Sequence, residues 1–191
     1  LNLKSYQLTL QEEKPKEEKN PFEAKSPDGK WIAYTKDYNL FIKSIESSKE
    51  FQLSTEGKRG YEYATRYDWY DKMEGENGER PKRFFMNWSE DSNWIATNII
   101  DTRNAEKMYM LDHSIDSLYK PKLLSYYRGS PGDTTMVMLT PVFYNIETKK
   151  EVKTSLPTGT HVNSVSIEGM KQSGELLAEY SERGYKKEVL K

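Results

Sequence analysis

The residues best suited to chemistry lie in one stretch, 60–81, which reads GYEYATRYDWYDKMEGENGERP and holds five aromatic and six acidic side chains. Carboxylates can pair with a cationic group while neighbouring rings contact its apolar part and attract its charge. Glu74 and Glu76 lie at the glycine-rich end of the stretch, and Trp69 and Tyr70 precede them. These residue types indicate a pocket for a cation. The structural alternative is that the rings pin an inserted loop onto the domain.

Signatures of catalysis are missing elsewhere in the sequence. A nucleophile elbow requires Gly-x-Ser-x-Gly, and neither this run nor a Walker or Rossmann glycine pattern is present. The chain has no cysteine, and its two histidines, His113 and His161, are far apart and lack metal-ligand spacing. We therefore expect no catalytic residue, no metal ligand and no cofactor in this chain.

Charge and composition exclude several classes of partner. The 191 residues include 29 basic and 30 acidic side chains, a formal net charge of -1, so we expect binding neither to nucleic acid nor to an anionic membrane surface. No apolar run is long enough to cross a bilayer. Aromatic residues make up 13% of the chain, which is typical of a folded domain rather than a disordered one.

Short strands, rather than helices, must position these residues. Pro27, Asp28 and Gly29 predict a turn, because proline fixes the backbone at its second position and glycine accepts a positive φ. The runs around this turn are short, and they are either apolar or alternate between apolar and polar residues. Strands are expected at 31–34, 39–45, 51–53, 84–88, 94–100, 107–111, 121–127, 136–139 and 142–146.

One of these units recurs along the chain. The run DGKWIA at 28–33 returns as DSNWIA at 91–96, 63 positions later, and more faintly as SGELLA at 173–178, a further 82 positions on. A four-stranded propeller blade takes about 40 to 45 residues, so these spacings require insertions. The repeat predicts an all-β fold that is part of a β-propeller, with about three blades and insertions between strands.

The repeats divide the chain into four parts of one partial propeller over 1–191. Residues 1–20 end a preceding blade and link it onward, 21–82 form a blade with the acidic aromatic insertion, 83–160 form a blade with a long insertion, and 161–191 begin an incomplete blade. We expect the chain to be a piece of a longer polypeptide. Three partial blades cannot close a ring, so open strand edges predict edge-to-edge self-association of the isolated chain.

The order of the motifs resembles the N-terminal propeller region of dipeptidyl peptidase IV-like serine peptidases, in the prolyl oligopeptidase family. The likeness covers nearly the whole chain, and it depends on the order of the motifs more than on any one of them. Its segments are SPDGKWIAY at 26–34, DYNLF at 37–41, YDW at 67–69, NWSEDS at 87–92, YKPK at 119–122, YRGSPGD at 127–133 and SERGYK at 181–186.

This resemblance implies an activity that the chain itself does not carry. In the family, an eight-bladed propeller caps an α/β-hydrolase domain with a Ser-Asp-His triad and admits peptides to the chamber between them. Two adjacent glutamates after an Asp-Trp pair bind the free amino terminus of the substrate through charge-assisted hydrogen bonds. Here Lys72, Met73 and Glu74 occupy the matching positions after Asp68-Trp69, so only Glu74 agrees with the family pattern, and Glu76 is placed to compensate.

The sequence thus favours a non-catalytic propeller segment that gates peptide access and binds the substrate amino terminus, with a peptide and a hydrolase domain of the same polypeptide as partners. An extracytoplasmic location, periplasmic or secreted, is implied by the family resemblance alone. The alternative is a stand-alone β-propeller that binds a protein or peptide and has no associated enzyme.

Overall fold

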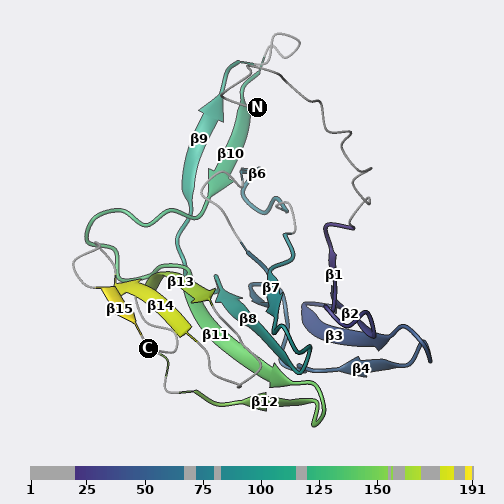
Figure 1. Ribbon diagram of the computed structural model, residues 1–191. Helices are drawn as coiled ribbons and strands as arrows, with labels where there is room; N and C mark the ends of the chain where they lie inside the picture. The colour runs from purple at the N-terminus through teal and green to yellow at the C-terminus, as the bar shows by residue number, and fades with distance from the viewer. Residues whose placement is uncertain are drawn as a thin grey trace, which may run out of the picture.

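The regular structure of the residues that the structure describes is entirely β, as the sequence predicts. The computed structural model describes residues 20–66, 72–79, 83–114, 120–154, 156, 162–168, 177–182 and 188–190. Within these ranges it contains fifteen strands, β1 to β15, and no helix. The strands form four antiparallel sheets (Figure 1).

The first sheet is a four-stranded meander built from the unit with the Pro-Asp-Gly turn. Its strands follow one another in space in the order of the sequence, and each pairs with the next in antiparallel register. Ala33, Leu40 and Ile42 are fully buried on it. The expected strands of this unit are therefore confirmed. They are β2 (Trp31–Lys36), β3 (Asn39–Ser44) and β4 (Glu50–Gln52), and the sheet also contains β1 (Glu23–Lys25), which the sequence did not predict.

A side-chain network closes the turn before β2. Ser26 Oγ donates to Asp28 Oδ1 (2.6 Å) and accepts a hydrogen bond from the backbone N–H of Trp31 (2.9 Å). Asp28 Oδ1 also accepts from the backbone of Lys30 (3.1 Å), while Gly29 has a φ of 73°. The serine and the aspartate together replace backbone partners that a tight turn leaves unmatched.

The second copy of the repeat forms the same network, which confirms that the two runs are structural equivalents. Ser89 Oγ donates to Asp91 Oδ1 (2.5 Å) and accepts from Trp94 N (2.9 Å). The two turns are also joined, because the backbone N–H of Asp28 donates to Ser92 Oγ (3.0 Å). Equivalent turns that contact each other place the two sheets side by side.

The second sheet differs from a simple meander because two strands share one of its positions. β5 pairs Tyr63 with Ile99, and β7 pairs Met86 with Thr97, both along the same edge of β8. The chain therefore leaves the sheet after β5 and returns to it at β7, within one strand position, and this segment is the first excursion. The strands of this sheet are β5 (Tyr61–Tyr63), β7 (Met86–Trp88), β8 (Trp94–Asp101), β11 (Met138–Asn145) and β12 (Lys150–Val152).

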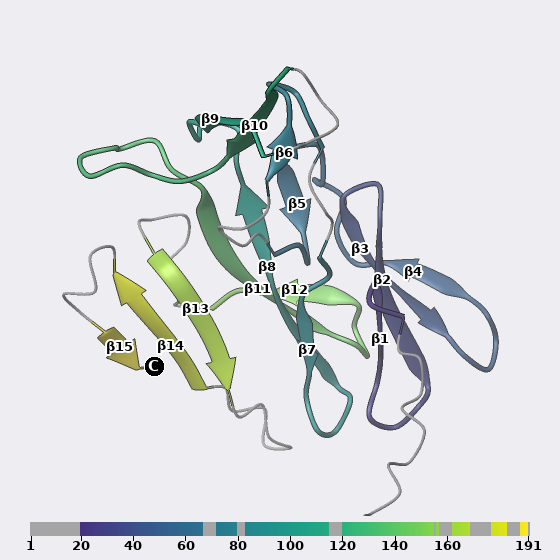
Figure 2. The ribbon, with the colours of Figure 1, turned by 90° about the horizontal axis from the view of Figure 1, so that it is seen from above.

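The segment between β8 and β11 also leaves the sheet, although these two strands are direct neighbours in it, and this segment is the second excursion. It contains the hairpin of β9 (Met108–Asp112) and β10 (Lys122–Tyr126), and β6 (Met73–Glu74) from the first excursion pairs with β10. The resulting small sheet, in the order β6-β10-β9, projects from the rest of the molecule as an arm (Figures 1 and 2). Two excursions that are separate in sequence thus fold together.

The remaining sheet consists of β13 (Val162–Glu168), β14 (Leu177–Glu182) and β15 (Glu188–Leu190), paired in sequence order. Figure 2 shows it on the opposite side of the second sheet from the first sheet. The three sheets other than the arm are therefore arranged successively, as propeller blades are.

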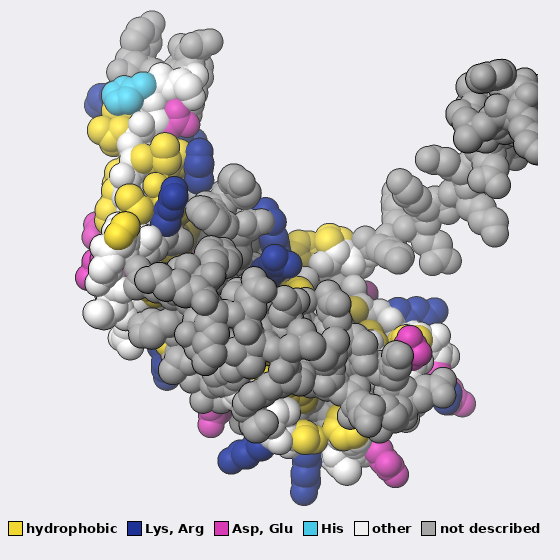
Figure 3. Space-filling model, turned by 60° about the vertical axis from the view of Figure 1, so that its left-hand side comes forward, with side chains coloured by type: hydrophobic (Ala, Val, Ile, Leu, Met, Phe, Trp, Pro, Cys, Tyr) yellow, Lys and Arg dark blue, Asp and Glu magenta, His cyan; other side chains and the backbone are white. Residues whose placement is uncertain are grey.

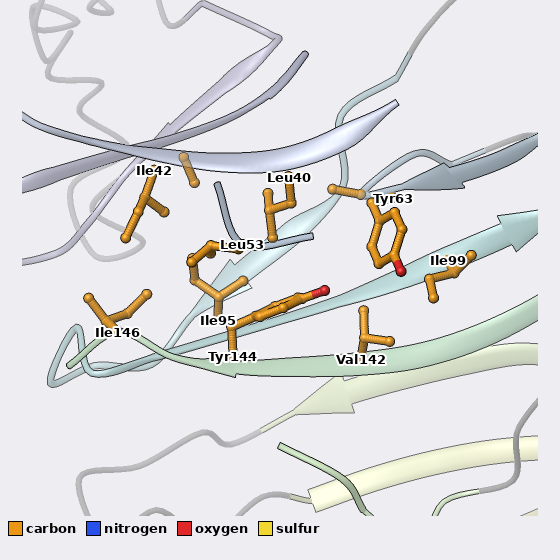
Figure 4. Packing of buried hydrophobic residues seen from close by; sticks show 11 residues of the cluster. Leu40, Ile42, Leu53, Tyr63, Ile95, Ile99, Val142, Tyr144 and Ile146 are labelled. Carbon is orange, nitrogen blue, oxygen red and sulfur yellow. The ribbon is translucent and has the colours of Figure 1, made fainter. Parts of the chain in front are cut away.

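The main core lies between the first and second sheets. Leu40 and Ile42 from β3 face Ile95 from β8 and Tyr144 from β11, all of them fully buried (Figure 4). Burying an aliphatic side chain of this size contributes about 1.5–3 kcal/mol. Trp88 adds a polar link, because its Nε1–H donates to the backbone oxygen of Ala24 (3.1 Å). The packing between the first and second sheets holds the second sheet, from which the arm departs, in place.

Candidate functional site

The neck of the first excursion is closed by backbone and amide hydrogen bonds. The N–H of Ala64 donates to Asn98 O, and the N–H of Phe85 donates to Ala64 O, each at 2.9 Å. The buried side chain of Asn98 donates from Nδ2 to Thr65 O (2.9 Å). Ala64 has a φ of 49°, which turns the chain out of the strand position. The excursion therefore begins from a fixed point on β8.

Glycines shape the loop that follows β6. Gly75 has a φ of 71°, a conformation that side chains other than glycine rarely adopt. At Gly78 an added Cβ would lie 1.9 Å from the backbone oxygen of Glu74, so no larger residue fits. The glycine-rich end of the acidic stretch is thus a tight turn that carries Glu74 at its start and Glu76 within it.

This turn, residues 74–78, is the acidic loop of the candidate site, and its first contacts are with β10. The N–H of Gly75 donates to Leu123 O (2.7 Å), and Gly75 O accepts from Ser125 Oγ (3.1 Å). Ser125 is fully buried, and Met73, which precedes the loop, is only 3% exposed. Because Met73 points inward, the next side chain along β6, Glu74, points outward.

Two cationic side chains hold the rest of the acidic loop. Lys107 Nζ donates to Glu76 O (2.5 Å), and Arg59 Nη2 donates to Asn77 O (3.2 Å). The Lys107 ammonium also lies 5.7 Å from the centre of the Tyr127 ring, within the range of a cation–π contact. Both cations bind backbone oxygens, so their contacts stabilise the path of the loop rather than neutralise its carboxylates.

The Glu74 carboxylate has a partner of its own. Lys122 Nζ lies 3.3 Å from Glu74 Oε2, and the two side chains are 37% and 70% exposed. A pair this open to solvent contributes about 0–1 kcal/mol and exchanges readily with other ions. The carboxylate therefore already attracts an ammonium group in a position that solvent reaches.

Two of the four site residues predicted from the sequence lie in the acidic loop. Glu74 and Glu76 lie in one turn and both are exposed. Trp69 and Tyr70 lie outside the described residues. Lys122, Lys107 and Ser125 contact the loop and were not predicted, because one lysine or serine among many carries no sequence signal without knowledge of the pairing of β6 with β10.

Neither a metal site nor a membrane span is found where the structure is described. In these parts of the chain, no group of three or more His, Asp or Glu side chains gathers closely enough to hold a metal ion. The same residues include no helix that is long and apolar enough to cross a membrane.

Comparison with known protein families decides the relationship. The family described as the dipeptidyl peptidase IV (DPP IV) N-terminal region matches residues 3–187, nearly all of the chain. This chain belongs to that family. The resemblance inferred from the order of the motifs is confirmed. A comparison with curated protein sequences gives no significant match.

Solved structures agree on the fold. The dipeptidyl peptidase 4 of Porphyromonas gingivalis is similar over 88% of this chain and 23% of its own, with a TM-score of 0.60 and 20% sequence identity. A candidate dipeptidyl aminopeptidase IV from Bacteroides ovatus is similar over 84% of this chain and 20% of its own, with a TM-score of 0.55 and 17% identity. This chain thus spans about a fifth of the length of these proteins, and the prediction of a partial β-propeller is confirmed.

Proposed function

We propose that this chain is the non-catalytic propeller segment of a dipeptidyl peptidase IV-like serine peptidase. In this proposal the propeller gates the access of peptides to a hydrolase domain of the same polypeptide, outside the cytoplasm. Glu74 binds the free amino terminus of the substrate, with Glu76 as a second carboxylate. Trp69 and Tyr70 contact the apolar part of the first substrate residue, a role that depends on the sequence pattern.

The origin of the acidic loop supports this role. In a propeller the innermost strand of each blade surrounds the central channel. β5 and β7 occupy the edge of their sheet opposite the outer strand β12, and the acidic loop departs between them. A loop that starts from the innermost position can reach a peptide that passes through or beside the channel.

The fixed shape of the acidic loop is the observation that carries the proposal. The backbone of three successive residues, 75–77, is held by hydrogen bonds from other segments, while the carboxylate of Glu74 stays exposed to solvent. Binding an ammonium costs less when the carboxylate needs little ordering. Such a site would accept peptides with a free amino group and discriminate against blocked ones.

Kinetics of the full-length peptidase test the proposal. The variants Glu74→Gln and Glu76→Gln are compared on one peptide with a free amino terminus and on the same peptide with an acetylated one. A hydrogen bond to a charged group is worth about 1.5–3 kcal/mol, so we expect Glu74→Gln to raise KM for the free peptide roughly 10-fold or more. We expect a smaller rise for Glu76→Gln and no change for the acetylated peptide.

Glu90→Gln is the matched control, because Glu90 is exposed in the turn before β8 and away from the acidic loop. It should leave KM for both peptides unchanged. If Glu74→Gln affects the free and the acetylated peptide equally, amine recognition by this loop is wrong. A protein without any peptidase activity that instead retains one stable partner in a pull-down would favour the stand-alone binding module.

A further inference from the structure

The structure also suggests a role for the second excursion. We infer that Ser125 and Lys107, together with Arg59, are positioning residues that hold the acidic loop in the conformation in which Glu74 meets the substrate amine. This inference rests on the proposed function and deepens it. It makes the β9–β10 hairpin a support of the substrate-binding loop, although the hairpin itself contributes no carboxylate to the site.

The pattern of acceptors on the loop is the main argument. Three successive backbone oxygens, those of Gly75, Glu76 and Asn77, each accept a hydrogen bond from a side chain that is 50, 31 and 18 positions away in the sequence. The three donors come from β10, from the segment before β9 and from the segment before β5. An ordinary turn has mostly local contacts, whereas this loop accepts hydrogen bonds from side chains of three separate segments.

The chemistry of each donor fits a positioning role. Ser125 is fully buried, so its side chain has a fixed surrounding from which its hydroxyl donates to Gly75 O. Lys107 is also directed by the Tyr127 ring. A cation that contacts a backbone oxygen strengthens the hydrogen bond through its charge. These contacts fix the backbone on both sides of Glu76 and directly after Glu74.

Lys122 provides a contrast within the same arm. Its ammonium meets the Glu74 carboxylate rather than the backbone, and it is a surface pair. A substrate ammonium must displace Lys122 from Glu74, whereas Lys107 keeps its backbone contact while substrate binds. The two lysines therefore act on different atoms of the loop, and substitution of each has a different expected result.

The experiment uses the full-length peptidase and measures two quantities. Hydrogen exchange of the Gly75 amide, which donates to Leu123 O, reports whether the loop is held. KM for the free-amine peptide and for its acetylated form reports whether the held conformation of the loop contributes to binding of the substrate amine. For the double variant Ser125→Ala, Lys107→Met, we expect hydrogen exchange of the Gly75 amide to be at least 10-fold faster. We expect KM for the free peptide to rise 3- to 10-fold. We expect kcat, and KM for the acetylated peptide, to stay unchanged.

Two further variants separate positioning from general destabilisation. Lys107→Arg retains a cationic donor and should restore most of the KM of the unaltered enzyme. Lys120→Met, at an exposed lysine just before β10, should change neither exchange nor KM. Lys122→Met should leave the exchange of Gly75 nearly unchanged and lower KM for the free peptide, since it removes a competing ammonium.

The possible failures are distinguishable. Unchanged exchange at Gly75 in the double variant overturns the inference, whatever Glu74→Gln does. Faster exchange with an unchanged KM also overturns it, because the contacts are then structural only. If Glu74→Gln itself has no effect on the preference for a free amine, the proposed function fails, and the positioning role fails with it.

Discussion

At the scale of single residues, Asp28 and Asp91 show how the repeat is stabilised. Partial desolvation opposes ionisation of each carboxyl. The hydrogen bonds that Ser26 and Lys30 donate to Asp28, and that Ser89 and Asn93 donate to Asp91, outweigh this effect and lower the pKa below the ordinary value of 3.8. Because both copies share the network, the same pair of residue types sets the strand start in two sheets.

These lowered pKa values predict a dependence of stability on pH. A carboxyl whose pKa is lower in the folded than in the unfolded protein stabilises the fold fully above its unfolded pKa, and the contribution is lost as pH falls through the folded value. We therefore expect the urea midpoint of the protein to be level from about pH 5 to 7 and to fall below about pH 4. The midpoint is measured by fluorescence at each pH.

The double variant Asp28→Asn, Asp91→Asn is expected to unfold at lower urea concentration at neutral pH and to lose part of the decrease below pH 4. Asp37→Asn serves as the control, since Asp37 lies in the turn between β2 and β3, where its φ is 49°, a conformation that asparagine tolerates. An equally steep decrease in the double variant would show that these two carboxylates do not carry the effect.

The site residues also differ in how far the sequence reveals them. Glu74 and Glu76 could be proposed from the sequence because acids, rings and glycines cluster in one stretch and because Glu74 agrees with a family pattern. The contacts of Ser125 and Lys107 with the acidic loop could not be predicted, since they join residues 50 and 31 positions apart. Such contacts depend on strand pairing, which local residue patterns do not specify.

At the scale of elements, the sequence predicts where strands occur better than which strands pair. β9 and β10 lie within one residue of the expected 107–111 and 121–127. The sequence predicts one blade with a long insertion over 83–160 but not which of its strands pair, and the structure pairs β8 directly with β11. Short strands have the same alternation in a blade and in an arm, so periodicity cannot distinguish the two.

The acidic stretch illustrates the same limit. The sequence predicts a blade with an acidic aromatic insertion over 21–82, and in the structure the chain leaves the second sheet after β5 and returns to it at β7, within a single strand position. β6 was not predicted at all, because it has two residues and pairs only with β10. Likewise, one strand, β11 (Met138–Asn145), joins parts of the two runs 136–139 and 142–146 that were expected as separate strands.

The neck of the first excursion gives a prediction at this scale. Asn98→Ala removes the Nδ2–H that donates to the oxygen of buried Thr65 and leaves that oxygen without this partner. Such a loss costs about 1–3 kcal/mol. We expect this decrease in the free energy of unfolding by urea, together with faster hydrogen exchange at Arg66, whose N–H donates to Arg83 O across the neck.

Asn104→Ala is the matched control, since Asn104 is exposed in the turn after β8. It should change the free energy of unfolding by less than about 0.5 kcal/mol. Equal stability of the two variants would mean that the side chain of Asn98 does not close the neck.

At the scale of the whole molecule, the arm and the open sheets expose surface that a complete propeller chain would be expected to cover or pair. β9 carries Met108, Tyr109, Met110 and Leu111, all between 38% and 56% exposed, and Leu123 on β10 is 39% exposed. Figure 3 shows hydrophobic side chains along the protruding arm. β9 is also an edge of its sheet, with backbone groups available for a further strand.

We therefore predict that the isolated 191-residue chain self-associates through these edges. Light scattering should show dimers or larger species at micromolar concentration. The double variant Tyr109→Lys, Leu111→Lys should weaken the association at least 10-fold, because charges on an edge strand oppose pairing. Ile45→Lys, at an exposed residue in the turn after β3, should not weaken it. A monodisperse monomer of the unaltered chain would contradict the prediction.

We propose that this chain is part of the propeller region of a longer serine peptidase, and a peptide map of the intact parent polypeptide is the first measurement to make. We expect a parent several times longer than 191 residues, since the chain spans 23% and 20% of two proteins of similar fold. We also expect a tryptic peptide with Gly-x-Ser-x-Gly beyond Lys191. A parent that ends near Lys191, or continues without that sequence, would contradict the proposal.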